Sequence, residues 1–198
     1  MTPATARRLT LEEYLIYDDG TDSRYELVDG VLVEMGAESP LNTAIAVFLV
    51  GFFLQSGIPV TRIGIKHLLA VSSSKVTARD PDLVIHSEAS YAAIAGATQA
   101  IVKANMPLPL LVIEVVSPGE PGTENYDRDY IDKRKEYAER GIPEFWLIDP
   151  SRSVVIVLSL INSSYKASEF RGSDQVESPT FPELGLVADQ VLKAGQSL

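Results

Sequence analysis

Leu110-Leu111-Val112-Ile113-Glu114-Val115-Val116 is the stretch that decides the fold, because it is the most apolar strand-like segment of the 198-residue chain. The apolar run covers residues 108–116, which is typical of a strand buried on both faces of a sheet. Prolines and glycines in residues 117–122 then predict a loop. A charged amphipathic helix is predicted over residues 126–140. This order of strand, loop and helix indicates an α/β domain.

The segments on either side of this strand predict a mixed sheet. Asp29-Gly30 is the signal of a two-residue hairpin turn within residues 24–35, and the apolar residues 42–55 predict a helix. We therefore expect one domain over residues 1–198, with a mixed central β-sheet flanked by helices, an N-terminal β-hairpin and a C-terminal β-meander. The other strands are predicted over residues 62–71, 82–85, 144–149, 154–160 and 165–170.

The composition excludes several classes of protein. The chain has no cysteine, which removes disulfide scaffolds, zinc fingers and thiol nucleophiles. Its longest uninterrupted apolar run, residues 44–54, has eleven residues, whereas a membrane-spanning helix needs about 20. We therefore expect a soluble, cytoplasmic protein with no membrane partner.

The charge argues against a general nucleic-acid binder. The 17 basic and 27 acidic residues give a net charge of −10, unlike the basic footprint that is usual for this class. A local basic rim is nevertheless predicted, because four cations fall in one stretch: Arg62, Lys66, Lys75 and Arg79.

Glu114 is the first candidate for chemistry, because it interrupts the most apolar strand. A buried carboxylate must be paired, protonated or bound to a metal. The spacing leaves open a purely structural ion pair with a lysine or arginine of the following helix. The two histidines, His67 and His86, lie at no ligand spacing from each other, and we expect them at strand ends, with His86 in a structural role.

Two other sequence patterns supply further candidate residues besides Glu114. Asp82 opens a short apolar strand, two residues after Asp80, so that the two would share one face if the strand began there. Asp129, Lys133 and Tyr137 form one stripe at helical spacing, which by itself is also typical of a solvated helix face. Together, two carboxylates and one lysine suit a site for Mg²⁺, which prefers one or two carboxylates, water and phosphate oxygens.

The order of these motifs resembles the Uma2 family. The resemblance rests on Arg24-Tyr25-Glu26-Leu27-Val28-Asp29-Gly30, Pro81-Asp82-Leu83-Val84, residues 111–118 and the run from Asp129 through Lys133 and Tyr137 to Pro150. This large bacterial group is described as endonucleases and as a domain of unknown function, and it is similar to a branch of the PD-(D/E)XK restriction-endonuclease-like fold. The resemblance covers about residues 10–192.

The resemblance implies a metal site and one departure from the family pattern. The metal ligands would be Asp82, Glu114 and the main-chain carbonyl of Val115, with Glu26 as an upstream acid. The lysine of the D/E-x-K motif would fall on Val116, so Lys133 is expected to replace it, with Lys66 and Lys135 as the alternatives. Asn42 stands where many relatives carry a histidine.

We therefore expect an endonuclease dependent on Mg²⁺ or Mn²⁺ that hydrolyses phosphodiester bonds of nucleic acid, with DNA as the expected substrate. The metal would lie between Asp82 and Glu114, and Lys133 would position the attacking water. The alternative is a catalytically inactive member of the fold that binds nucleic acid or a protein. A purely structural protein is a third interpretation, and a homodimer is expected and compatible with all three.

Overall fold

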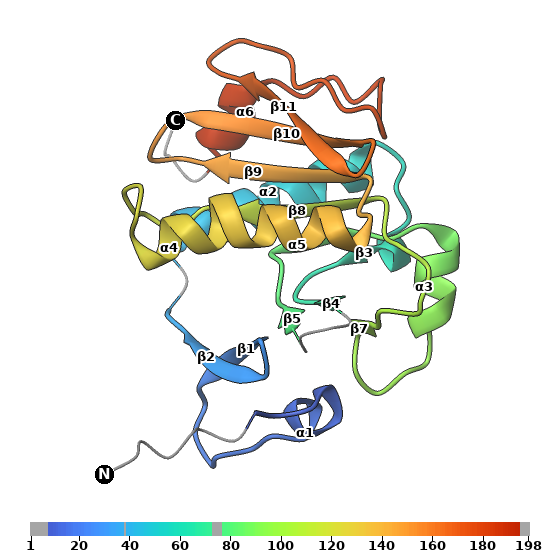
Figure 1. Ribbon diagram of the computed structural model, residues 1–198. Coiled ribbons are helices and arrows are strands. Elements are labelled where there is room, and N and C mark those ends of the chain that lie inside the picture. Colours follow the sequence, from blue (N-terminus) through green and yellow to red (C-terminus); the bar gives the residue numbers. More distant parts are fainter. Residues whose placement is uncertain (1–7, 38, 73–76, 195–198) are drawn as a thin grey trace.

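The computed structural model describes residues 8–37, 39–72 and 77–194. Within these ranges the strands form a six-stranded sheet, in the upper half of Figure 1, and a five-stranded sheet below it. Both sheets contain parallel and antiparallel pairs. The predicted α/β class with a mixed central sheet is therefore confirmed, whereas the second sheet was not predicted.

The six-stranded sheet is centred on the apolar strand. All five residues of β8 (Leu111–Val115) are buried. This strand pairs parallel with β9 (Glu144–Asp149) and antiparallel with β6 (Leu83–Ile85). Such double-sided burial explains why its sequence shows no alternation of apolar and polar residues. The remaining strands of this sheet are β3 (Ile63–Gly64), β10 (Val154–Ile161) and β11 (Ser164–Phe170), of which the last two form the predicted meander.

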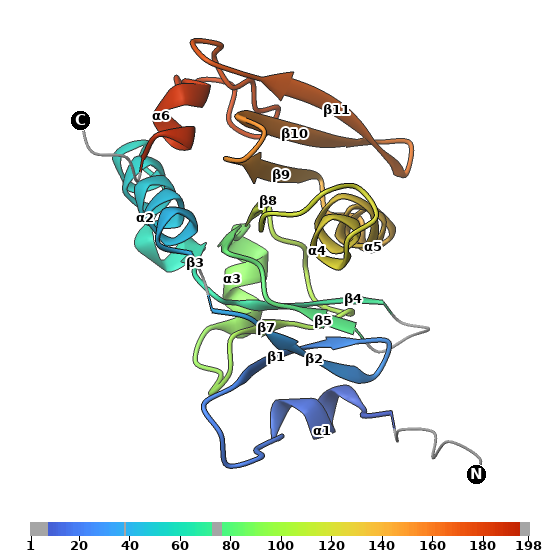
Figure 2. The ribbon, with the colours of Figure 1, turned by 90° about the vertical axis from the view of Figure 1, so that its left-hand side faces the viewer.

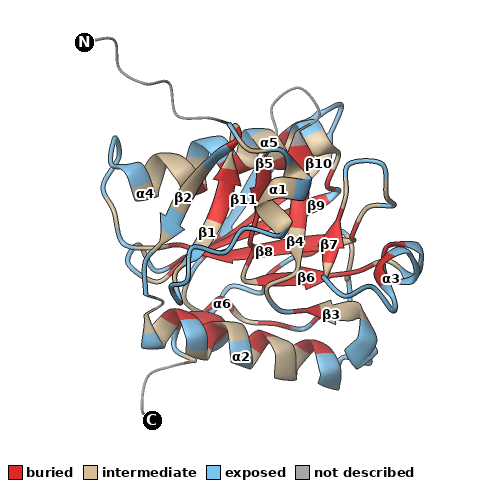
Figure 3. Cartoon of the chain, turned by 90° about the horizontal axis from the view of Figure 1, so that it is seen from below, coloured by how far each residue is buried: buried red, intermediate tan, exposed pale blue. Residues whose placement is uncertain are grey.

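Helices cover both faces of this sheet (Figure 2). On one face α2 (Pro40–Gln55) buries Ile45, Leu49 and Phe53 completely, with α6 (Ala188–Leu192) beside it. The outward side of α2 is exposed (Figure 3). On the other face α5 (Lys133–Arg140) packs against β9. No helix within the described ranges has the length and apolar character needed to cross a membrane.

The five-stranded sheet is built on the predicted hairpin. β1 (Arg24–Val28) and β2 (Val31–Met35) pair antiparallel across Asp29 and Gly30. Their φ angles of 51° and 79° are those of the predicted two-residue turn. α1 (Leu11–Leu15), which begins with a capping box, lies below this sheet in Figure 2. The other strands are β4 (Leu68–Ser72), β5 (Thr77–Arg79) and β7 (Ile101–Val102).

The strand predicted over residues 62–71 is not one strand. The chain passes from the turn η1 (Val60–Arg62) into β3 of the six-stranded sheet, and then crosses to β4 of the five-stranded sheet. Lys66, between β3 and β4, has a φ of 58°, which interrupts an extended backbone. This crossing links the two sheets. The helix α3 (Glu88–Ile94) was also not predicted.

The helix predicted over residues 126–140 is continuous but not uniform. It begins as α4 (Glu124–Asp127), widens into a π-helical turn, η2 (Arg128–Asp132), and continues as α5. It ends at Gly141, whose φ of 85° is the left-handed conformation that commonly ends helices. Single π-helical turns are frequent at functional sites.

Candidate active site

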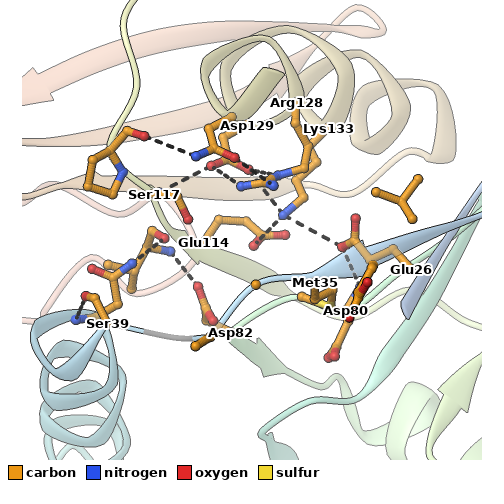
Figure 4. A pocket seen from close by; sticks show the side chains of 18 residues that line it. Glu26, Met35, Ser39, Asp80, Asp82, Glu114, Ser117, Arg128, Asp129 and Lys133 are labelled. Atoms are coloured by element: carbon orange, nitrogen blue, oxygen red, sulfur yellow. Dashed lines mark hydrogen bonds and ion pairs between the residues drawn. The ribbon is translucent and has the colours of Figure 1, made fainter. Parts of the chain in front are cut away.

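A cavity of about 250 Å³ lies where the two sheets meet the long helix (Figure 4). Its walls come from β1, β2, the beginning of α2, the end of β8 and the α4–η2–α5 helix. Among the residues that the structure describes, six acidic and two basic side chains line it, which gives these residues a formal charge of −4, and such a cavity attracts cations. The charged lining residues are Glu26, Glu34, Asp80, Asp82, Glu114, Asp129, Arg128 and Lys133.

Lys133 is the central cation of this cavity. Its Nζ lies 2.9 Å from Glu114 Oε2, 3.3 Å from Asp129 Oδ1 and 3.9 Å from Glu26 Oε1. Burial alone would lower the pKa of Lys133, but these carboxylates outweigh it and hold the pKa above its ordinary value. The expected approach of Lys133 to Glu114 is therefore present, and its ammonium stays protonated.

Neither of the two alternative lysines lines the cavity. Lys135 is exposed and pairs with Glu139, four residues along the helix, so it does not line the cavity. Lys66 does reach the site from outside, because its Nζ donates to Asp82 Oδ1 at 3.1 Å.

Glu114 is buried and hydrogen-bonded on both oxygens. Tyr137 donates its hydroxyl to Oε1 at 2.7 Å, and Lys133 binds Oε2. Burial raises the pKa of Glu114 to about 8, Lys133 opposes this, and the charges of Asp82 and Asp129 add to it. The pairing of Glu114 with a lysine of the following helix, which the spacing left open, is present as a contact of 2.9 Å with Lys133. Because it joins the two residues that the resemblance implies, it does not exclude a catalytic role.

Asp82 is tied to the end of β8 through the backbone. It lies just before β6, so that it does not share a strand face with Asp80, and its Oδ2 accepts from the Val115 amide at 2.8 Å. The Val115 carbonyl accepts from Nδ2 of Asn42, at 3.2 Å. Asp82, Glu114 and the Val115 carbonyl thus lie on one wall of the cavity. Asn42, at the beginning of α2, donates the hydrogen bond that orients this carbonyl.

Glu26 is fixed by two donors of the five-stranded sheet. Arg79 Nη1 donates to Oε2 at 2.8 Å, and the Asp80 amide donates to Oε1 at 3.1 Å. Burial would raise the pKa of Glu26, but Lys133 and Arg79 outweigh it and lower the pKa to about 2. Glu26 is therefore ionised, and both of its oxygens already accept hydrogen bonds.

The predicted basic rim is wrong for the residues that the structure describes. Arg79 is buried, and Glu136 holds the rest of its guanidinium at 2.7 and 2.9 Å. Arg62 donates to the His86 carbonyl, and Lys66 binds Asp82. Lys75 lies outside the described residues. The error arises because all three residues of β5 face the interior, which its short sequence does not reveal.

The sequence reasoning missed the role of Arg128. Its guanidinium binds both oxygens of Asp129, at 3.0 and 3.2 Å, and lines the cavity while remaining partly exposed. Asp129 in turn accepts from the Ser117 amide. Regular helical spacing places Asp129 and Lys133 on one face but gives no signal for Arg128, which lies in the π-helical turn.

The histidines, which were not expected to meet, are in contact outside this cavity. His67 Nδ1 lies 2.9 Å from His86 Nε2, and His86 Nδ1 lies 2.9 Å from Ser90 Oγ. Gly64 allows this approach, since a Cβ there would stand 2.4 Å from His67 Nδ1. The contacts agree with the structural role predicted for His86.

The donors of the cavity fit a hard divalent cation held in part by water. Asp82, Glu114 and the Val115 carbonyl offer oxygen only, which suits Mg²⁺ or Mn²⁺ better than zinc. Among the described residues no three acidic, histidine or cysteine side chains form a complete metal cage. One or two carboxylates with water and substrate phosphate are the usual set for Mg²⁺.

Comparison with known proteins identifies the family and the fold of the chain. The model of the Uma2 family, described as "Putative restriction endonuclease", matches residues 11–189. The chain belongs to the Uma2 family. It is also similar to the crystal structure of a "putative nuclease belonging to DUF820" from Anabaena variabilis ATCC 29413, with a TM-score of 0.71 and 18% identity. The match covers 94% of this chain and 99% of the other, and it shows a shared fold. No curated protein matches the chain.

This Uma2 chain has no lysine where the D/E-x-K motif would place one. Val116 is buried in the apolar core, and its amide donates to the Ile148 carbonyl. A lysine side chain at this position would be buried in the core at a large desolvation cost. Lys133 instead brings an ammonium to Glu114 from the helix on the far wall.

Proposed function

We propose that this Uma2 protein is a metal-dependent nuclease that hydrolyses phosphodiester bonds of nucleic acid, with DNA as the expected substrate. The observation that carries the proposal is the convergence of Asp82, Glu114 and the buried Lys133 in one acidic cavity. Membership of a family described as restriction endonucleases, and a fold shared with a protein described as a nuclease, support it.

Different residues of the chain would bind the metal and orient the attacking water. Asp82, Glu114 and the Val115 carbonyl would hold Mg²⁺ or Mn²⁺, with Glu26 as a further ligand candidate on the opposite wall of the cavity. When bound, the metal would polarise the phosphodiester and lower the pKa of a bound water. Lys133, which stays protonated, would orient the attacking water and offset developing charge, and it does not serve as the base.

Arg128 would add a contact with the substrate. Its side chain is partly exposed in the cavity wall, and a guanidinium can donate two parallel hydrogen bonds to the oxygens of a phosphate. Its Nε and Nη2 donate to Asp129 and its Nη1 donates to Asn125, so the guanidinium is held in position, and its remaining N–H groups on Nη1 and Nη2 would make the contact with the substrate.

Cleavage of supercoiled plasmid and of single-stranded DNA in Mg²⁺ or Mn²⁺ tests the proposal. The wild-type protein should cut in a metal-dependent manner, and Asp82→Asn should lose the activity. Asp189→Asn, which changes a partly exposed acid outside the cavity, is the matched control. If neither metal supports cutting of either substrate, the chain is not a nuclease of this kind.

The alternative is a catalytically inactive binding module. Its support is the net charge of −10 and the pairing of both cavity cations with acids of the protein. An inactive module would bind nucleic acid or a protein without binding Mn²⁺ in the cavity, so metal binding distinguishes the two candidates.

A further inference from the structure

A second cavity, of about 340 Å³, adjoins the first. Asp80 lines both cavities. Lys66 lines the second and donates to Asp82 of the first at 3.1 Å. The other walls come from α1, the loop that follows it, the beginning of β1 and Gln99. A linear polymer bound at Asp82 would therefore extend into the second cavity.

Aromatic side chains make up one part of this second cavity. Tyr14, Tyr17 and Tyr25 line it, and the rings of Tyr17 and Tyr25 meet edge to face with centroids 5.8 Å apart. Tyr17 is 43% exposed, so its ring is open to a ligand. Aromatic rings beside cationic groups are the combination that binds single-stranded nucleic acid, because every base offers a face for stacking.

The polar groups of the second cavity suit a nucleotide. Arg24 keeps half of its side chain exposed while it binds Asp80, and it is the cation of this cavity that a phosphate would contact, whereas Lys66 is paired with Asp82. Asp80 Oδ1 is a buried acceptor that has no hydrogen-bond partner among the described residues. An N–H of a base would satisfy this acceptor.

The acidic loop beside the cavity does not oppose this assignment. Asp18, Asp19 and Asp22 do not line the cavity. Asp18 and Asp19 accept hydrogen bonds from the backbone amides of Gly20 and Thr21, and Asp19 also accepts from the Tyr25 hydroxyl at 2.7 Å, so both carboxylates are already engaged by the protein.

We propose that the second cavity binds the nucleotide adjacent to the phosphate held at Asp82 and Glu114, and that it takes this nucleotide from a single strand. The inference rests on the proposed function. A base inside a duplex is stacked on both faces and paired at its edge, so it does not present the free face that Tyr17 and Tyr25 would contact. The chain should therefore prefer single-stranded or locally opened nucleic acid over an intact duplex.

Binding of short labelled oligothymidylate and oligouridylate tests the subsite without turnover. Fluorescence anisotropy is measured in Ca²⁺, and a gel verifies that the strands remain intact. Tyr17→Ala should lower the affinity about 5- to 100-fold through loss of stacking. Arg24→Gln should also lower it, more strongly at low salt than at high salt, because phosphate contacts are screened.

The control variants match these residues in exposure but lie outside both cavities. Ile161→Ala is the control for Tyr17, and Arg171→Gln, whose side chain is 51% exposed, is the control for Arg24. Both should bind as the wild type does. Thermal unfolding and Mn²⁺ titration of each variant verify the fold and the first cavity.

The outcomes separate this subsite from the proposed function. Wild-type affinity in both Tyr17→Ala and Arg24→Gln, no binding of single strands by the wild type, or equal affinity for a duplex would each overturn the subsite. A protein that binds strands through this cavity but cuts no substrate would overturn the nuclease and leave the subsite standing. If the wild type cuts DNA and both variants bind single strands as the wild type does, the subsite is overturned and the nuclease proposal stands.

Discussion

Lys133 neutralises part of the charge of three carboxylates in a buried site, so its removal should lower the stability of the fold. Lys133→Met leaves Glu114, Asp129 and Glu26 without their shared cation. We expect the free energy of unfolding to fall by about 3–5 kcal/mol in the absence of metal, the range for breaking a buried ion pair. Urea unfolding measures this change. Added Mn²⁺ should restore part of it, because the metal binds only the folded chain.

Lys135 offers a matched control for that measurement. It lies two residues further on the same helix but is 74% exposed. Lys135→Met should change the free energy of unfolding by less than about 1 kcal/mol, as is usual for surface pairs. Equal effects of the two substitutions would contradict the buried position of Lys133.

His86 should make the fold sensitive to mild acid. Burial lowers the pKa of His86 to about 4, and the charges of His67 and Arg62 add to this. The unfolded chain takes up this proton near pH 6.5, whereas the folded chain takes it up only near pH 4. The stability due to neutral His86 is therefore complete above pH 6.5 and is lost as the pH falls toward 4.

Comparison of the wild type with His86→Gln measures this contribution. Between pH 6.5 and 4 the free energy of unfolding of the wild type should fall by about 1–3 kcal/mol more than that of the variant. Parallel curves for the two proteins would show that His86 does not titrate in this way.

At the level of single residues, sequence reasoning succeeded where the local pattern was strong. Glu114 was found because it interrupts an apolar strand, and Lys133 because Asp129 and Tyr137 share its helix face. Arg79 was misplaced on the surface. Its partners, Glu26 and Glu136, are 53 and 57 residues away in sequence, and no local pattern reports such contacts.

At the scale of secondary-structure elements, the ion pair between Arg79 of β5 and Glu136 of α5 should hold in place the helix that carries Lys133. Arg79 on β5 binds Glu136 of α5 and Glu26 of β1 with the same guanidinium. Arg79→Met should therefore lower the free energy of unfolding by about 3–5 kcal/mol. Combining it with Glu26→Gln should recover part of this loss, because one uncompensated charge is removed.

A double-mutant cycle on Arg79 and Glu26 gives the coupling directly. A coupling energy above about 1 kcal/mol, measured by urea unfolding, agrees with the contact at 2.8 Å. Strict additivity of the two substitutions would contradict it.

The elements that could be predicted are those with a local signature. The apolar run of β8, the Asp29-Gly30 turn and the meander all carry one, and the structure shows each of them. The separation into two sheets could not be predicted, because the chain leaves one sheet for the other near Lys66, whose left-handed backbone is rare for lysine and has no local sequence signal. The π-helical turn at Arg128–Asp132 likewise has no pattern of its own.

For the whole molecule, the homodimer remains a prediction with one candidate surface. α2 carries no charged residue, and Val47, Leu54 and the nearby Val60 are 63%, 41% and 68% exposed. Light scattering should give twice the mass of the chain, and Val47→Asp should shift it toward the monomer. A wild-type monomer at high concentration would contradict this prediction.

The central claim for the whole molecule is a divalent metal held at the acidic cavity between the sheets. Calorimetric titration with Mn²⁺ tests it most directly, with Glu139→Gln, an exposed acid outside the cavity, as control. We predict one site in the wild type and in the control, and its loss in Glu114→Gln and Asp82→Asn with the fold intact. Wild-type Mn²⁺ binding in Glu114→Gln, or no binding by the wild type, would contradict the account.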